Sequence, residues 1–127
     1  MSATSIDPRL FGESTLPVVQ AKTLPPQCYT SADFFTFEKD AVFGHDWCCV
    51  GRESWLPDAG SYFTVDLVDE PLIVVRGKDR QIRAMSAVCR HRGMVIAEGS
   101  GKCNSFLCQY HHWVYSTDGR LTGAPQS

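Results

Sequence analysis

Two cysteine–histidine pairs near the end of the 127-residue chain are the residues best suited to chemistry. Cys89 and His91 have one residue between them, and Cys108 and His111 have two. Sixteen residues lie between His91 and Cys108. Thiolates and imidazoles together bind either zinc or an iron–sulfur cluster. The spacing therefore predicts a metal centre built from two loops.

Each pair is expected to follow the end of a β-strand, where the backbone can turn two side chains toward one point. Strands are predicted at 82–88 and 105–107, directly before the two cysteines. Gly93 and the glycine-rich segment 99–101 supply the backbone conformations that tight loops need. The two loops are thus expected to face one another across a small β-structure.

The rest of the chain after residue 47 shows the period of two that is typical of strands. Residues 61–67 alternate cleanly between apolar and polar, and a β-branched run follows at 72–76. Further short strands are predicted at 47–50, 81–85 and 113–116. Many short strands separated by turns predict an all-β sandwich or small barrel.

The N-terminal part is different in composition. Residues 1–28 hold four of the seven prolines and no sustained periodicity, which predicts an extended arm. A helix is predicted at about 31–43, because apolar residues recur there at helical spacing. The Thr30 hydroxyl with Asp33 three residues later fits a capping box, and Gly44 is a plausible stop.

Charge and composition exclude several classes of function. The net charge of −2 offers no basic stripe for nucleic acid. No apolar run approaches the length of a membrane span, and the N-terminus lacks the pattern of a secretory signal. The expected location is therefore the reducing cytoplasm. Four of the six cysteines are expected to be small buried apolar residues: Cys28, Cys48, Cys49 and Cys103.

The distribution of ligands favours iron–sulfur over zinc. Zinc fingers usually place both cysteines in one half of the motif and both histidines in the other. Here each half carries one of each. A Rieske [2Fe–2S] centre needs two cysteines on one iron and two histidines on the other, and two cysteine–histidine loops supply that arrangement.

The motif resembles the Rieske domain of the alpha subunit of ring-hydroxylating oxygenases. The residues that carry the resemblance are Cys89-Arg90-His91-Arg92-Gly93 and the run from Cys108 through Gln109, Tyr110, His111, His112 and Trp113 to Leu121, with Trp47, Gly60, Asp69 to Leu72 and Gly123 to Pro125. The resemblance implies an all-β, Rieske-type antiparallel β-sandwich with a smaller cluster-binding part of two loops at about 87–121. An arm at 1–28 and one helix would precede it, and the domain would span 29–127.

The same resemblance implies the cluster ligands Cys89, His91, Cys108 and His111. The family commonly has proline where Gln109 stands and a small residue where His112 stands. His112 is thus a rival ligand, although the spacing favours His111. The other expected neighbours of the cluster are Arg90, Arg92, Gly93, Tyr110, His112 and Trp113. Two roles are open for the arginines: they hold the loops or a partner's carboxylates, or they form a solvated basic pair. Tyr110 and Trp113 are expected to pack under the loops.

The family takes an electron from a reductase or ferredoxin and passes it to a mononuclear Fe(II) that activates dioxygen. That iron lies in the catalytic domain of the same or a neighbouring subunit, in homotrimers or in hetero-oligomers with a beta subunit. This chain stops where relatives continue, so it is expected to be a fragment with no catalytic residue. The resemblance implies mono- or dioxygenation, with aromatic hydrocarbon catabolism as the process. The alternatives are a free-standing Rieske ferredoxin and a structural zinc-binding interaction module.

Overall fold

The computed structural model describes residues 6–125. Contacts divide the chain into two compact units, Met1–Cys48 and Cys49–Ser127. The helical region predicted at about 31–43 falls in the first unit. The division into an arm at 1–28 and a domain at 29–127 stays a prediction. Among the described residues, no helix has both the length and the apolar character needed to cross a membrane.

The first unit is helical in its second half. Helix α1 (Gln27–Thr30) is followed by α2 (Ala32–Glu38), which continues into a π-helical turn at Lys39–Phe43. The predicted cap at Thr30 is wrong, because Thr30 is the last residue of α1. Ser31 caps α2 instead, and its Oγ accepts a hydrogen bond from the Phe34 backbone N–H at 3.2 Å. A 3-10 turn, Pro8–Phe11, lies in the segment predicted as an extended arm.

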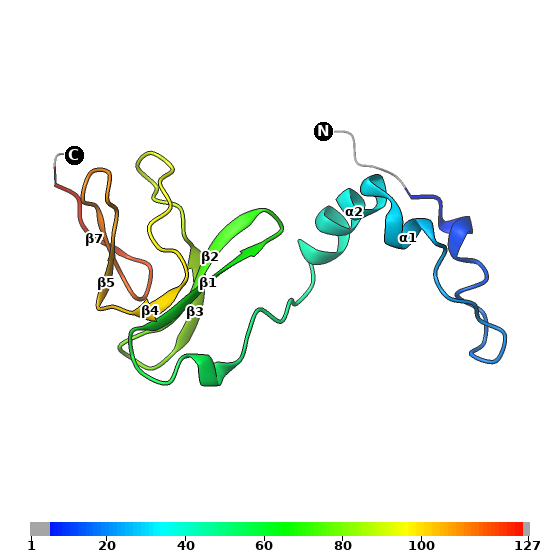
Figure 1. Ribbon diagram of the computed structural model, residues 1–127, viewed down its shortest axis with the longest axis horizontal. Coiled ribbons are helices and arrows are strands. Elements are labelled where there is room, and N and C mark those ends of the chain that lie inside the picture. Colours follow the sequence, from blue (N-terminus) through cyan, green and yellow to red (C-terminus); the bar gives the residue numbers. More distant parts are fainter. Residues whose placement is uncertain (1–5, 126–127) are drawn as a thin grey trace. The chain divides into compact units, whose positions relative to one another are not determined.

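The second unit consists of two antiparallel sheets (Figure 1), which confirms the predicted all-β class. The four-stranded sheet has the order β3-β2-β1-β4, and the three-stranded sheet has the order β5-β6-β7. The strands are β1 (Ser61–Leu67), β2 (Glu70–Arg76), β3 (Ile82–Ser86), β4 (Ser100–Lys102), β5 (Ser105–Leu107), β6 (Val114–Ser116) and β7 (Leu121–Gly123).

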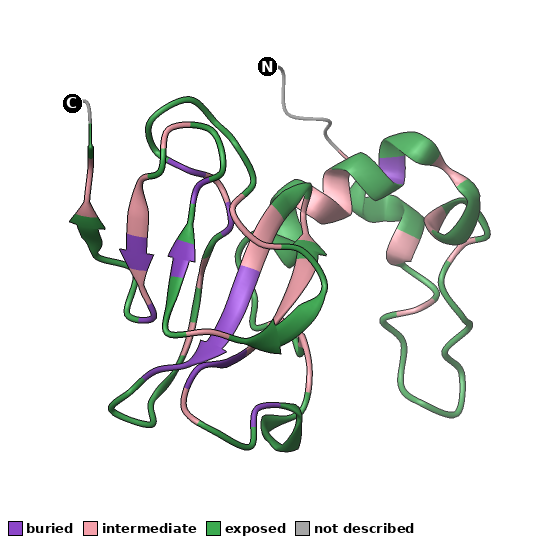
Figure 2. Cartoon of the chain, turned by 60° about the vertical axis from the view of Figure 1, so that its left-hand side comes forward, coloured by how far each residue is buried: buried purple, intermediate pink, exposed green. Residues whose placement is uncertain are grey.

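Alternate residues of both sheets form the core of this unit. Ile73 and Val75 of β2 are fully buried, and Phe106 of β5 and Tyr115 of β6 belong to the same cluster. Figure 2 shows the buried stretches running along strands of both sheets. Burying one such side chain stabilises a fold by about 1.5–3 kcal/mol. The period-two pattern therefore places one face of each sheet against the other.

Two strand predictions were wrong. Residues 47–50 form no strand, and the Trp47 side chain is fully exposed. Strand β4 was missed, because Ser100 and Gly101 lack the β-branched or aromatic side chains that signal a strand. A Cβ at Gly101 would lie 3.2 Å from the ring of Tyr62 on β1, so a larger residue there would require that ring to shift.

Arg76 at the end of β2 ties the segment before β1 to the sheet. Its side chain is only 11% exposed. Its Nε donates to the Leu56 carbonyl at 2.6 Å, and its Nη1 donates to the Arg80 carbonyl at 3.0 Å. Its Nη2 forms an ion pair with Glu53 at 2.9 Å. One buried guanidinium thus holds the 3-10 turn Glu53–Trp55 and the β2–β3 turn together.

Candidate metal centre

The first candidate loop leaves β3 and is closed by backbone hydrogen bonds around Cys89. The Cys89 N–H donates to the Met94 carbonyl at 2.7 Å, and the Cys89 carbonyl accepts from the Gly93 N–H at 3.0 Å. Gly93 has a positive φ of 71°, which glycine adopts without steric cost. The loop therefore turns sharply just after His91.

The second candidate loop, between β5 and β6, repeats this pattern. The Cys108 N–H donates to the Trp113 carbonyl at 2.8 Å, and the Cys108 carbonyl accepts from the His112 N–H at 3.0 Å. His112 has a positive φ of 59°. Each loop thus places its cysteine at the end of the buried sheet and its histidine in the turn.

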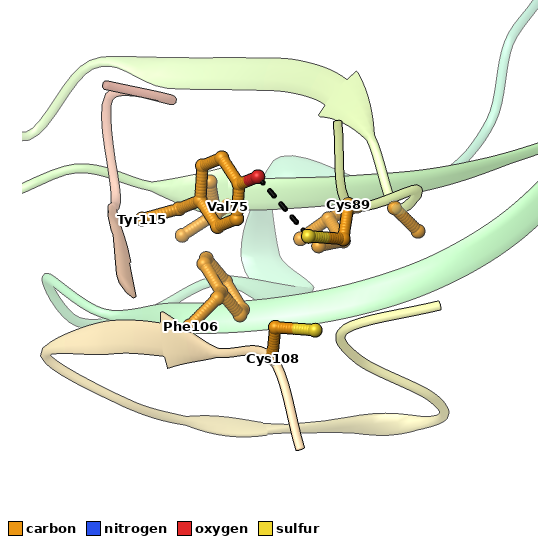
Figure 3. Packing of buried hydrophobic residues seen from close by; sticks show 7 residues of the cluster. Val75, Cys89, Phe106, Cys108 and Tyr115 are labelled. Carbon is orange, nitrogen blue, oxygen red and sulfur yellow. Dashed lines mark hydrogen bonds between the residues drawn. The ribbon is translucent and has the colours of Figure 1, made fainter. Parts of the chain in front are cut away.

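The two cysteines meet in the core. Both are 2% exposed and belong to the cluster of buried side chains between the sheets. In Figure 3 they reach into the core from opposite segments, Cys89 beside Tyr115 and Cys108 beside Phe106. Cys108 is one of the groups that help to lower the pKa of the Cys89 thiol. The structure therefore brings together two thiols that are distant in sequence.

Tyr115 supports the first of these thiols. Its hydroxyl lies 3.2 Å from the Cys89 Sγ and accepts a hydrogen bond from the Arg90 N–H at 3.1 Å. With Cys89 in its thiolate form the sulfur has no proton to give, so the hydroxyl is the donor of this bond. Tyr115 was missed as a site residue in the sequence. The signal in the sequence that could have found it is the alternation of side chains along β6, which places Tyr115 on the face that meets the core, together with Phe106.

Electrostatics favour the thiolate form of Cys89. Burial alone would raise the pKa of this thiol. Hydrogen bonds from Tyr115, the backbone of His91 and Arg92, and Cys108 outweigh burial and hold the Cys89 pKa below its usual value. A thiolate is the form of cysteine that binds metals.

The histidines of the two loops also meet. The rings of His91 and His111 lie 4.6 Å apart at an angle of 67°. The His111 Nδ1 is buried and has no hydrogen-bond partner among the described residues. Burial, followed by the positive charges of His91, Arg92 and His112, lowers the pKa of His111. A neutral imidazole with a buried, unpaired nitrogen fits a metal ligand, because an uncompensated buried polar atom is otherwise costly.

The four candidate ligands form a cysteine pair and a histidine pair. A structural zinc ion takes four ligands around one point. The rings of His91 and His111 form one pair, and the buried thiols of Cys89 and Cys108 form the other. Two pairs fit a binuclear centre, since each iron of a Rieske cluster takes two protein ligands.

The expected neighbours of the cluster divide into surface and core residues. Arg90, Arg92 and His112 are exposed. Tyr110 is 54% exposed, with its ring 3.9 Å from that of His111, so it lies beside the loops rather than under them. Trp113 is half-buried and packs against the core cluster, as expected for a residue beneath the loops.

Comparison with known proteins points to one family. Residues 46–127 match the family model of the Rieske [2Fe-2S] domain. The carnitine monooxygenase oxygenase subunit of Escherichia coli (strain K12) is 40% identical over 106 residues, which are 83% of this chain and 28% of that protein. The benzene 1,2-dioxygenase subunit alpha of Pseudomonas putida is 38% identical over 107 residues, 84% of this chain and 24% of that protein.

Solved structures show the same fold. A quaternary ammonium Rieske monooxygenase superposes with a TM-score of 0.78 at 40% identity, over 84% of this chain and 30% of that one. Naphthalene 1,2-dioxygenase superposes with a TM-score of 0.66 at 33% identity, over 70% of this chain and 20% of that one. The resemblance inferred from the sequence is thereby confirmed. The chain spans about a quarter of the length of the curated relatives it matches.

Proposed function

The chain belongs to the Rieske [2Fe-2S] domain family, and from that premise we propose that Cys89, Cys108, His91 and His111 hold a [2Fe–2S] cluster that carries single electrons. The observation that carries the proposal is the pairing of ligands. Two buried thiols face each other, and a histidine pair with one buried, unpaired nitrogen lies beside them.

The chain's own residues have distinct tasks in this proposal. Cys89 and Cys108 bind from within the core, where water is excluded. The Tyr115 hydroxyl donates to Cys89 and draws negative charge from the sulfur. The His91 ring is exposed, so it is the ligand that a partner protein can approach. When bound, the cluster supplies one-electron oxidation and reduction.

We further propose that the chain delivers electrons within an oxygenase alpha subunit. The relatives are named as oxygenase subunits, and the chain spans only about a quarter of their length. The electron donor would be a reductase or ferredoxin. The acceptor would be a mononuclear iron in a catalytic domain of the same or a neighbouring subunit, in a homotrimer or with a beta subunit.

The substrate would be chosen in that catalytic domain. A carnitine monooxygenase and a benzene dioxygenase are almost equally similar to this chain, at 40% and 38% identity. Amine oxidation and aromatic-ring hydroxylation are therefore both compatible with this electron carrier. A reducing cytoplasm is the proposed location.

Metal analysis tests the proposal. Protein purified without oxygen is expected to contain two irons and two acid-labile sulfides per chain and little zinc. After reduction with dithionite it should give the electron paramagnetic resonance (EPR) signal of a [2Fe–2S] cluster with histidine nitrogen couplings. His91→Ala and His111→Ala should each lose that signal, whereas the matched controls His112→Ala and Cys103→Ser should keep it.

One zinc per chain without sulfide would contradict the proposal and support the interaction module instead. Loss of the signal in His112→Ala but not in His111→Ala would reassign the fourth ligand. Iron and sulfide in full amounts with unchanged spectra in all four variants would refute the ligand assignment.

A further inference from the structure

The Trp113 side chain lies flat on the imidazole of His91. The two ring centroids are 4.7 Å apart, and the ring planes are inclined by only 8°. The residues come from different loops, His91 from the first and Trp113 from the end of the second. The stack is therefore a contact between the loops.

The backbone and the side chain of Trp113 are both held in place by the second loop and the core. Its carbonyl accepts the Cys108 N–H at 2.8 Å, which fixes its backbone to the second loop. Its side chain packs against the buried core cluster. An indole held in this way keeps a fixed orientation, because close-packed side chains have little freedom to change rotamer.

His91 has no comparable support elsewhere. Its side chain is exposed, and no described residue forms a hydrogen bond with its ring nitrogens. Among the described residues, the only other ring in contact is that of His111, which meets it edge-on. Ligand histidines are usually oriented by a hydrogen bond to the second ring nitrogen. Among the described residues, stacking on an indole is the contact that orients His91.

We propose that Trp113 is a positioning residue that sets the plane of the His91 imidazole and covers one of its faces. The inference rests on the proposed role of His91 as a cluster ligand. The second loop then controls both histidines, its own His111 through the backbone and His91 through the Trp113 ring.

Tyr110 offers a matched control. Its ring also touches a candidate ligand, at 3.9 Å from His111, but it is inclined by 36° and the residue is 54% exposed. It therefore lacks both the parallel geometry and the anchor in the core. Removing the Tyr110 ring should leave the orientation of its histidine unchanged.

The experiment compares four loaded proteins: wild type, Trp113→Leu, Trp113→Phe and Tyr110→Leu. Pulsed EPR reads the histidine nitrogen couplings, and a chelator assay reads the half-time of cluster loss. Trp113→Leu should shift or broaden the couplings of one histidine and shorten the half-time roughly five-fold, the order of effect of one aromatic contact on an equilibrium. Trp113→Phe should largely restore both, and Tyr110→Leu should match wild type. Wild-type couplings and half-time in Trp113→Leu would overturn the proposal.

A second measurement uses iron-free protein and remains decisive if Trp113→Leu does not fold. In a Trp47→Phe/Trp55→Phe background, Trp113 is the only indole of the chain. The His91 ring is the only partner stacked flat on the indole among the described residues, so His91→Leu should change the Trp113 emission while His112→Leu should leave it unchanged. Equal emission from both variants would refute the stack and the proposal with it. Absence of a cluster from wild-type protein would instead refute the proposed function, which the metal analysis detects separately.

Discussion

His112 occupies in the second loop the place that Gly93 occupies in the first. Both residues have a positive φ, 59° and 71°, and both donate their backbone N–H at 3.0 Å to the carbonyl of their loop's cysteine. A side chain in this left-handed region is sterically disfavoured, although histidine tolerates it better than most residues. The second loop therefore carries a conformational cost that the first loop avoids.

Exchanging the residue type at these two positions should change stability in opposite directions. His112→Gly should stabilise the fold by about 0.5–1 kcal/mol, because relief of about 1–2 kcal/mol of backbone strain is partly offset by the greater freedom of glycine in the unfolded chain. Gly93→Ala should destabilise by a similar amount, since a Cβ there meets no atom within 4 Å and only the backbone conformation matters. Urea unfolding of iron-free protein measures both. A His112→Gly protein that is less stable than wild type would show that the His112 side chain makes a stabilising contact.

Tyr115→Phe should lower the midpoint potential of the cluster without removing it. The hydroxyl proton that Tyr115 directs to the Cys89 sulfur favours the more negative, reduced state. Loss of about 1 kcal/mol of hydrogen bonding corresponds to roughly 45 mV for a one-electron couple. Protein-film voltammetry measures the shift. Tyr62→Phe is the control, because Tyr62 packs edge-on against Phe106 in the same core. An equal shift in both variants would rule out a specific effect of the Tyr115 hydroxyl.

Arg76→Met should destabilise the second unit by about 2–4 kcal/mol. The substitution leaves the buried Leu56 carbonyl without its donor, and an unsatisfied buried acceptor costs far more than an exposed one. Glu53→Gln should cost less than about 1 kcal/mol, because the Glu53 side chain is 76% exposed and its ion pair is solvated. Chemical unfolding monitored by circular dichroism compares the two. Similar losses would mean that the ion pair, rather than the bonds to the carbonyls, holds the turn.

Acid stability should depend on Asp79 and Asp118. A hydrogen bond from Arg83, followed by one from the Gln81 backbone, lowers the pKa of Asp79 to about 2. Hydrogen bonds from Ser116 and then Arg120 lower the pKa of Asp118 to about 2. A depressed carboxyl pKa contributes stability that is complete above the unfolded value of 3.8 and is lost as pH falls toward the folded value.

The Asp79→Asn/Asp118→Asn protein should therefore lose less stability than wild type between about pH 4 and pH 2. Thermal unfolding of iron-free protein across that range gives the slope of the unfolding free energy against pH for each protein. Identical slopes for the two proteins would show that other carboxyl groups govern the acid transition. Above about pH 5 the unfolding free energies of the two proteins should differ by a constant amount. The two wild-type carboxyl groups are ionised there in both the folded and the unfolded chain.

Local patterns in the sequence were enough for the class of fold and the family. The alternation at 61–67 and the β-branched run at 72–76 predicted β1 and β2, because strand side chains alternate between a buried and an exposed face. The types and spacing of Cys89, His91, Cys108 and His111 named the proposed ligands, since metal preference depends on the donor atoms. The local rules failed at 47–50, which form no strand, and at β4, where pairing with β1, not propensity, decides that a strand forms.

Only the tertiary structure decided how the candidate ligands are supported. Tyr115 meets Cys89 across 26 positions of sequence, and Trp113 meets His91 across two loops. Neither contact follows from residue spacing, because both depend on how the two sheets pack and where each loop leaves its strand. The sequence by itself thus determined which side chains could bind a cluster. The packing of the sheets determined which neighbours hold those side chains, since that depends on contacts between residues far apart in the chain.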